Sequence, residues 1–194
     1  MMEAASMRSA INSRNTLKHG IIFILSGLLS PQAQAIDLNF SAVLTSGTCT
    51  FDLDKNTLPL GRIHLKEMAA STLKAVQPFT LTVSRCTGSV PGLKPAVYVS
   101  GEGINQAGKW LFRSSAGSTA TGMGVMLVKS DTPPDYSYQA VKDGSKFELA
   151  ASGAVPADQD LQFYAGLTCG NATTCSTATA GIVTARIVFK LDFN

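Results

Sequence analysis

The last fourteen residues of the 194-residue chain constrain its fold most strongly, because every odd position there is small or apolar while most even positions are polar. The even positions carry polar residues such as Arg186, Lys190 and Asp192. Small or apolar residues occupy the odd positions: Gly181, Val183, Ala185, Ile187, Phe189, Leu191 and Phe193. A period of two is that of an extended strand with one buried face. We therefore expect a β-strand of about thirteen residues, roughly 43 Å long, whose exposed edge would be an aggregation hazard unless another strand covers it.

The same alternation recurs along the rest of the chain, between turns rich in Gly, Ser and Asp. It is found at residues 57–65, 79–83, 96–99, 124–128, 146–149 and 161–165. Only a turn near residues 65–70 departs from it. Several short strands of this kind predict an all-β fold, an antiparallel β-sandwich of the immunoglobulin type. No break in composition divides residues 36–194, so we expect a single domain there.

The N-terminal 35 residues have the three parts of a secretory signal peptide. Basic residues precede a ten-residue apolar run and then a small-x-small triplet: Arg8, Arg14 and Lys18, followed by 20–29 and 33–35. This order predicts cleavage after Ala35 and export of residues 36–194. A membrane anchor is the alternative, but ten helical residues rise only about 15 Å, roughly half the hydrocarbon thickness of a bilayer. We expect no membrane span in the exported part.

Four cysteines stand in the exported part, and an oxidising compartment favours disulfides over a metal site. They are Cys49, Cys86, Cys169 and Cys175. Three pairings are possible. We favour Cys49 with Cys86 and Cys169 with Cys175, because the short interval of the second pair closes easily and the first pair then joins two predicted strands. A four-cysteine zinc site is the alternative, but the usual gaps of two to four residues are absent.

Residues 36–46 alternate as cleanly as the C-terminal segment. The residues at every second position are Ile36, Leu38, Phe40, Ala42 and Leu44. In an autonomous sandwich they would form the first strand. A free N-terminal strand can equally pair with the open edge of a neighbouring molecule. Burial of these side chains would contribute a gross hydrophobic term of about 6 to 12 kcal/mol, enough to hold a polymer together.

Charge and composition exclude several classes of function. Residues 36–194 carry 13 Lys and Arg against 12 Asp and Glu, a net charge of +1, so we expect no nucleic-acid partner. His64 is the one histidine of this part. The sequence contains no Gly-x-Ser-x-Gly nucleophile elbow, and its scattered Asp and Glu residues do not single out a pair of catalytic carboxylates. We therefore expect no catalytic residues, no metal and no cofactor. Trp110 could be a sugar-stacking platform, but a buried aromatic is the favoured interpretation.

These features together resemble the chaperone-usher pilins, the subunits of type-1-like bacterial fimbriae. Gly181 stands fourteenth from the C-terminus and Phe193 is a penultimate aromatic, where Phe replaces the more usual Tyr. Cys49 and Cys86 match the family's disulfide between early strands, and residues 161–165 are also similar. The similarity extends over essentially all of residues 36–194.

The resemblance implies an immunoglobulin-like sandwich that lacks its last strand and is completed by a donated one. A periplasmic pilus chaperone would first fill the groove beside the C-terminal strand. At an outer-membrane usher, the N-terminal extension of the neighbouring pilin subunit would replace it. The donor side chains would be Ile36, Leu38, Phe40, Ala42 and Leu44, from the extension at 36–46. The acceptor groove and chaperone-binding strand, in the sandwich of residues 47–194, would include Gly181, Val183, Ala185, Ile187, Phe189, Leu191 and Phe193.

The implied function is that of a structural subunit of a fimbrium on the cell surface, which supports cell adhesion. A single-domain adhesin or a minor tip or adaptor subunit of the same fibre is the alternative. Two features depart from the family. Ala42 stands where donor strands usually carry Gly, and the Cys169–Cys175 pair lies outside the family's core pattern. We expect that pair to staple the loop before the last strand.

Overall fold

A computed structural model describes residues 47–194, so the predicted signal at 1–35 and the alternating segment at 36–46 lie outside the described residues. The elements in chain order are β1 (Thr48–Leu53), the 3-10 helix η1 (Leu65–Glu67), β2 (Lys74–Thr87), β3 (Pro95–Ser100), β4 (Gly103–Gln106), β5 (Lys109–Phe112), β6 (Gly124–Lys129), β7 (Lys146–Glu148), β8 (Gln159–Thr168), α1 (Ala172–Ser176) and β9 (Val188–Phe193). Nearly all of the regular structure is therefore β-strand.

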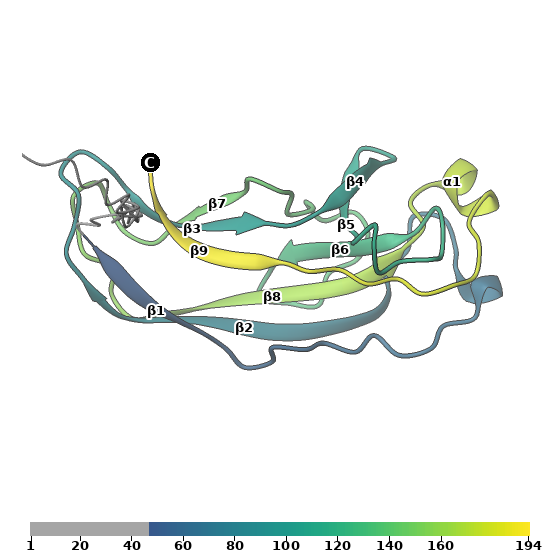
Figure 1. The fold of residues 1–194 in the computed structure, drawn as a ribbon, viewed down its shortest axis with the longest axis horizontal. Coiled ribbons are helices and arrows are strands. Elements are labelled where there is room, and N and C mark those ends of the chain that lie inside the picture. Colours follow the sequence, from purple (N-terminus) through teal and green to yellow (C-terminus); the bar gives the residue numbers. More distant parts are fainter. Residues whose placement is uncertain (1–46) are drawn as a thin grey trace, which may run out of the picture. The chain divides into compact units, whose positions relative to one another are not determined.

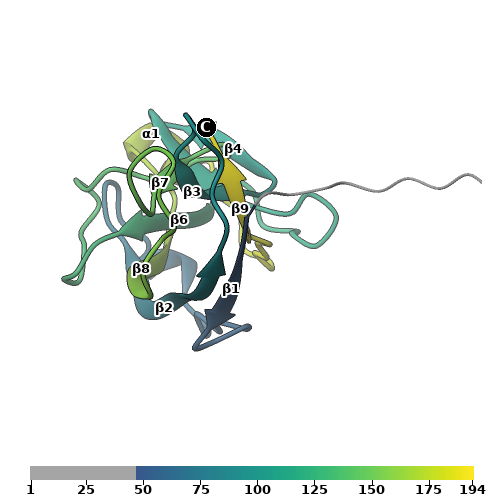
Figure 2. The same ribbon diagram turned by 90° about the vertical axis from the view of Figure 1, so that its left-hand side faces the viewer.

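Two antiparallel sheets form the described part of the chain. The larger sheet has the order β1-β2-β8-β6-β5-β4, and the smaller one has the order β7-β3-β9. Figure 1 shows β9 alongside β3, and Figure 2 views the two layers nearly end-on. The strands pack as a β-sandwich, which confirms the predicted fold class.

Apolar side chains from both sheets meet in one main core. Phe163 of β8 is fully buried at its centre and stacks on Phe79 of β2, with 5.6 Å between the ring centroids. Phe147 of β7 and Phe189 of β9 approach the same ring, with centroids 5.6 and 5.3 Å away. Four phenylalanines thus join four strands across the sandwich.

Most of the alternating runs form the predicted strands. Residues 79–83, 96–99 and 124–128 lie within β2, β3 and β6. Residues 161–165 lie within β8, and the run at 146–149 forms β7 with only its last residue outside the strand. The turn expected near residues 65–70 contains η1.

The run at 57–65 does not form the predicted strand. β1 ends at Leu53, and the last backbone bond toward β2 joins Asp54 N–H to Thr80 O at 3.2 Å. Beyond that point the chain leaves β2, and Pro59 has no N–H to donate. Leu58 and Leu60 still pack against the core.

The predicted thirteen-residue C-terminal strand is also shorter than expected. Only Val188–Phe193 is assigned as strand, because Val188 is paired with Ser100, the last residue of β3. After Ser100 the chain turns away into β4 of the other sheet. Residues 181–187 therefore continue without a strand partner on that side.

The structure has the disulfide pairing that the sequence favours. Cys49 of β1 is bonded to Cys86 of β2, and Cys169 is bonded to Cys175 of α1. None of the helices in residues 47–194 has the length and apolar character needed to cross a membrane.

Candidate functional site: a groove beside the C-terminal segment

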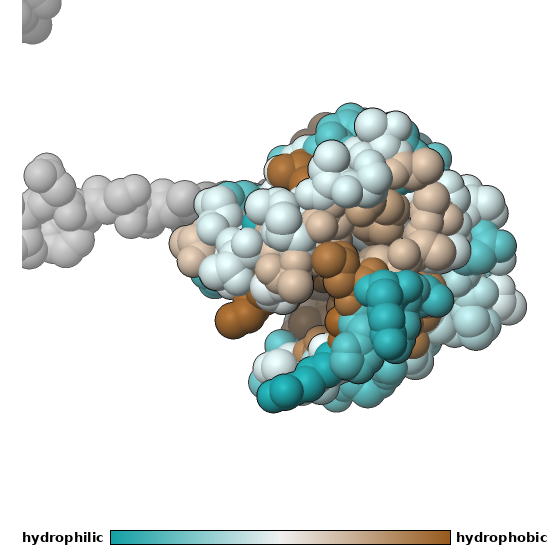
Figure 3. Space-filling view, turned by 90° about the vertical axis from the view of Figure 1, so that its right-hand side faces the viewer, coloured by the Kyte–Doolittle hydropathy of each residue, from teal (hydrophilic) through white to brown (hydrophobic). Residues whose placement is uncertain are grey.

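An open groove of about 910 Å³ runs between the segment after β1 and the C-terminal segment. One wall is formed by residues 53–65 and the other by residues 180–189. Phe79, Val125 and Ala165 of the main core form part of its floor. Figure 3 views the end of the molecule that carries α1, where hydrophobic residues gather around a hollow. The sandwich is therefore open to solvent along this side.

The alternation of hydrogen-bonded and non-hydrogen-bonded pairs between β9 and β3 shows in which direction each backbone group of β9 points. The backbones of Lys94 and Asn194 exchange two hydrogen bonds, of 2.7 and 3.0 Å. In an antiparallel ladder, every second pair bonds in this way. The even-numbered residues of β9 therefore bond to β3. The N–H and C=O groups of the odd-numbered residues point away from β3, and among these residues Phe189 lines the groove.

The same parity continues upstream of β9, where a loop takes the place of β3. The N–H of Thr119 donates to Ile182 O at 2.8 Å, and the N–H of Ser114 donates to Thr184 O at 2.7 Å. The Ser118 hydroxyl also accepts from Thr184 N–H at 3.0 Å and donates to Thr184 O at 3.1 Å. One edge of the segment is thus satisfied by strand β3 and by this loop.

The other edge has no strand beside it within residues 47–194. We call it the acceptor edge, and it consists of the backbone groups that point away from β3 and from the loop, those of Val183, Ala185, Ile187, Phe189, Leu191 and Phe193. These residues span about 33 Å if fully extended. An edge of this length can accept an additional β-strand, with main-chain hydrogen bonds along it.

The predicted acceptor residues divide between two cavities. Gly181, Val183, Ala185, Ile187 and Phe189 line the groove. Leu191 and Phe193 do not. They line a separate cavity of about 410 Å³ together with residues 47–49 at the start of β1.

Sequence reasoning misses the wall opposite the C-terminal segment. Leu58, Leu60 and Ile63 are half-buried and line the groove from that side. Their alternating spacing predicts an ordinary sandwich strand instead. Pro59 lies within the run at 57–65 and indicates that this segment does not form a complete hydrogen-bonded ladder with a neighbouring strand.

Gly181 lies where only glycine fits. Its φ is +156°, and a Cβ at this position would stand 2.5 Å from Ala120 N and 2.7 Å from Thr119 Oγ1. The close approach lets the loop run beside the segment that forms the groove wall. The backbone of Ala120 cannot move without breaking its 3.0 Å bond to Ile182 O.

Gly181→Ala is therefore expected to destabilise the domain by about 1 to 3 kcal/mol, measured from the urea midpoint at an unchanged slope. Gly61→Ala is the matched control, because Gly61 has φ +78° but no atom within 4 Å of the place where an added Cβ would stand. The free energy of unfolding of Gly61→Ala should fall only by the cost of placing an alanine at a positive φ. Equal losses in the two variants would show that the contact with Ala120 carries no energy.

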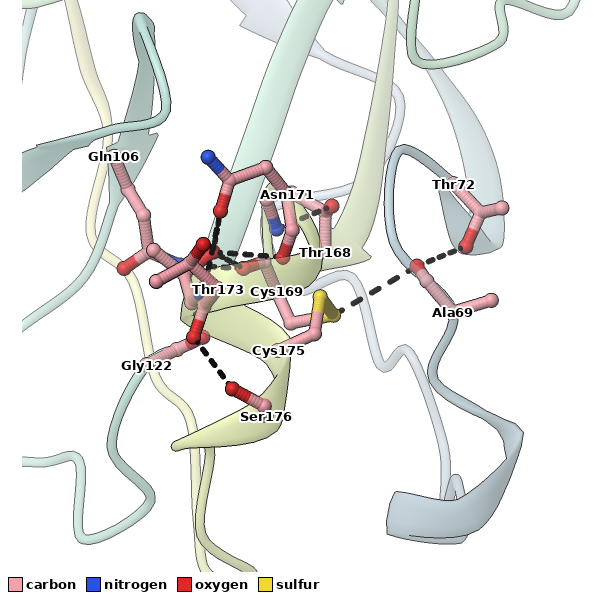
Figure 4. The surroundings of a disulfide bond; sticks show 12 residues. Ala69, Thr72, Gln106, Gly122, Thr168, Cys169, Asn171, Thr173, Cys175 and Ser176 are labelled. Carbon is pink, nitrogen blue, oxygen red and sulfur yellow. Dashed lines mark hydrogen bonds between the residues drawn. A yellow bond between two sulfur atoms is a disulfide. The ribbon is translucent and has the colours of Figure 1, made fainter.

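Figure 4 shows the surroundings of the second disulfide, which joins Cys169 to Cys175 of α1. Cys169 is fully buried, and its carbonyl accepts from Gln106 Nε2 at 2.7 Å. The Asn171 side chain caps α1 by accepting from Thr174 N–H at 3.0 Å. Cys169 also belongs to an apolar cluster against which Val183 packs. The disulfide thus holds the loop that leads into the groove wall.

Charged side chains near the groove are cationic. Lys55 and Arg62 line it, and no acidic residue of the described part does. On the outer face of β9, Lys146 Nζ lies 2.8 Å from Asp192 Oδ2, and this bond lowers the pKa of the Asp192 carboxyl. The Asp192 charge is therefore already neutralised by its neighbour.

The groove can bind an apolar strand, but it has no arrangement of catalytic groups among the described residues. His64 is exposed, and no group of three or more metal-ligating side chains occurs in residues 47–194. Trp110 is half-buried, packs against the main core and meets the Phe112 ring edge-on at 6.2 Å between centroids. Its packing favours the structural interpretation over a sugar-binding platform.

Comparison with known proteins connects this fold to one family. The family model described as "Fimbrial protein" matches residues 38–194. The uncharacterized fimbrial-like protein YadM of Escherichia coli K12 is 24% identical over 165 residues, which cover 78% of this chain and 86% of YadM.

Solved structures are similar to this chain at lower identity. The P pilus rod subunit PapA is 13% identical, with a TM-score of 0.50 over 81% of this chain and 100% of PapA. An antigen and type I fimbria protein of Burkholderia pseudomallei is 14% identical, with a TM-score of 0.44 over 75% of this chain and 99% of that protein.

Proposed function

This chain belongs to the fimbrial protein family, and on that premise we propose that it is a structural subunit of a bacterial fimbrium that polymerises by donor-strand exchange. The acceptor edge is the observation that carries the proposal. It joins a row of backbone groups that no strand of residues 47–194 pairs with to an open groove with a largely apolar lining. An added strand would satisfy the backbone groups and cover the exposed core in one step.

Residues 36–46 of a neighbouring copy are the proposed donor strand. Their apolar residues recur at the spacing that a groove beside a strand requires. Ile36, Leu38, Phe40 and Leu44 would each contribute about 1.5 to 3 kcal/mol on burial. This gross hydrophobic term and the new main-chain hydrogen bonds would together hold one subunit to the next.

An unoccupied groove needs a temporary cover before assembly. Exposed strand edges and apolar patches of this size promote aggregation. We propose that a periplasmic chaperone supplies this cover, and that an outer-membrane usher is the place where the neighbour's donor strand replaces it. The proposal includes export by the signal at 1–35, a place in the fimbrium on the cell surface and a role in cell adhesion.

A peptide-complementation experiment tests the mechanism. A chain that begins at Gly47 should be unstable or self-associating when it is produced without a chaperone. A synthetic peptide of residues 36–46 should raise its melting temperature and keep it monomeric. A peptide of the same composition in scrambled order is the control. A shortened chain that is monomeric, stable and indifferent to both peptides would refute donor-strand exchange.

A further inference from the structure

Lys190 is a cation on β9 that the described part of the structure does not pair with a carboxylate. The three ion pairs within residues 47–194 join other residues, and the nearby Asp192 is taken by Lys146. The Lys190 ammonium lies 4.6 Å from the centroid of the Tyr98 ring, on the exposed face of the sheet. A strand added at the acceptor edge would therefore pass beside an exposed positive charge.

The donor segment carries one charged residue, Asp37. Asp37 lies between Ile36 and Leu38, so its side chain points to the solvent face when those two are buried. We propose that Asp37 of one copy pairs with Lys190 of the next copy, and that this pair fixes the register of the exchanged strand. The inference rests on the proposed function, since it concerns the same groove.

The pairing follows from the direction and register of the added strand. Antiparallel ladders are slightly more stable per residue than parallel ones. With Leu44 opposite Val183 in an antiparallel pair, Phe40 lies opposite Ile187 and Leu38 lies opposite Phe189. The last two pairs combine an aromatic with a branched aliphatic side chain, a favourable cross-strand combination. The same register sets Asp37 opposite Lys190.

Backbone parity brings the two charges close together. The odd-numbered residues of the acceptor edge form the hydrogen-bonded pairs with the donor, so the even-numbered ones form the non-hydrogen-bonded pairs. In such pairs the Cα atoms are only about 4.5 Å apart and the side chains are closest. Lys190 and Asp37 would form a pair of this kind.

Neighbouring registers lose the charge pair. A slip of two residues toward the C-terminus places Asp37 opposite Asp192, a carboxylate that already holds Lys146, so no charge pair forms. A slip of two residues the other way places Asp37 opposite Val188, which is apolar and exposed. All three registers bury the apolar face of the donor, and only the first combines the aromatic–aliphatic pairs with a pair of opposite charges.

The direction also determines which molecule supplies the strand. Gly47 packs at the Phe193 end of the C-terminal segment, as a Cβ on it would lie 2.8 Å from the Phe193 ring. The chain's own residues 36–46 could therefore enter its own groove only parallel to the C-terminal segment. An antiparallel donor must come from a second copy.

A charge-swap experiment on the full chain tests the pair. The probe is a fluorescent synthetic peptide of residues 36–46, either unchanged or with Asp37→Lys. Lys190→Glu in the chain, or Asp37→Lys in the peptide, should weaken capture of the peptide about ten-fold, because like charges then face each other. The two changes together should restore capture to within about two-fold of the original. Arg186→Glu, a charge reversal on the same face, is the control and should not be rescued by Asp37→Lys.

A cross-linking readout checks the register directly. A peptide with Ser41→Cys should form a disulfide with a chain that carries Arg186→Cys, and not with one that carries Val188→Cys. Cross-linking to position 188, or equal capture of all charge variants, would overturn the inference while donor-strand exchange stands. Failure of every peptide to bind would count against the proposed function as well.

Discussion

Phe40→Asp is expected to abolish fibre assembly while residues 47–194 fold as before. In the proposed exchange the Phe40 ring leaves water and enters the groove, which contributes about 1.5 to 3 kcal/mol. The substitution removes that gain and adds the cost of placing a carboxylate against an apolar floor that includes Phe79, Val125 and Ala165. Subunit association should weaken by about a hundred-fold or more, which corresponds to a loss of about 3 kcal/mol.

Asn39→Asp is the matched control for this experiment. It adds the same charge one residue away, at a position that faces solvent when Phe40 is buried. Polymer length, measured by electron microscopy and by sedimentation, should collapse for Phe40→Asp and stay near the original for Asn39→Asp. Equal polymer from both variants would mean that residue 40 is not buried between subunits.

Most of the strands that the sequence predicts bury one face, whereas β6, predicted at 124–128, is buried at all five of those positions. Leu81 and Val83 of β2 are buried in the core while the adjacent Thr80 and Thr82 stay half-buried, so a period of two is visible. The hairpin of β4 and β5 shows no such period, because apolar side chains pack on both faces of the sheet at β5. Leu111 packs in an apolar cluster on one face, whereas Phe112 belongs to the main core on the other.

The remaining misses have other physical causes. β1 has Cys49, Phe51 and Leu53 at every second position. The first of these residues is a cysteine, which is assigned from the sequence to a disulfide and is not counted as part of an apolar pattern. α1 has five residues and is too short to show a helical period. Its position is set by the Asn171 cap and the disulfide.

The sequence predicts more of the acceptor side of the candidate site than of the opposite wall of the groove. Alternation identifies the odd-numbered residues from Gly181 onward, and five of them line the groove. Alternation shows which face of a strand is buried, but it does not show whether the second edge has a partner. That depends on where the segment after β1 leaves β2, which is a tertiary property.

Phe163→Ala is expected to be the most destabilising single substitution in the core, with a loss of about 3 to 5 kcal/mol. The ring is fully buried and meets Phe79, Phe147 and Phe189, which come from three other strands and both sheets. Truncation leaves a cavity between the sheets that the two layers cannot close without moving β9. Urea unfolding of the full chain should show a lower midpoint at an unchanged slope.

The contact with Phe189 extends the effect of Phe163→Ala to the groove, since Phe189 is both a groove-lining residue and a neighbour of the lost ring. Capture of the 36–46 peptide should therefore weaken together with stability. Phe163→Leu keeps much of the volume and should recover most of both losses. If Phe163→Ala lowered stability but left peptide capture unchanged, the core beneath β9 would not support the acceptor edge, and the groove would owe its shape to the loop at 114–121 alone.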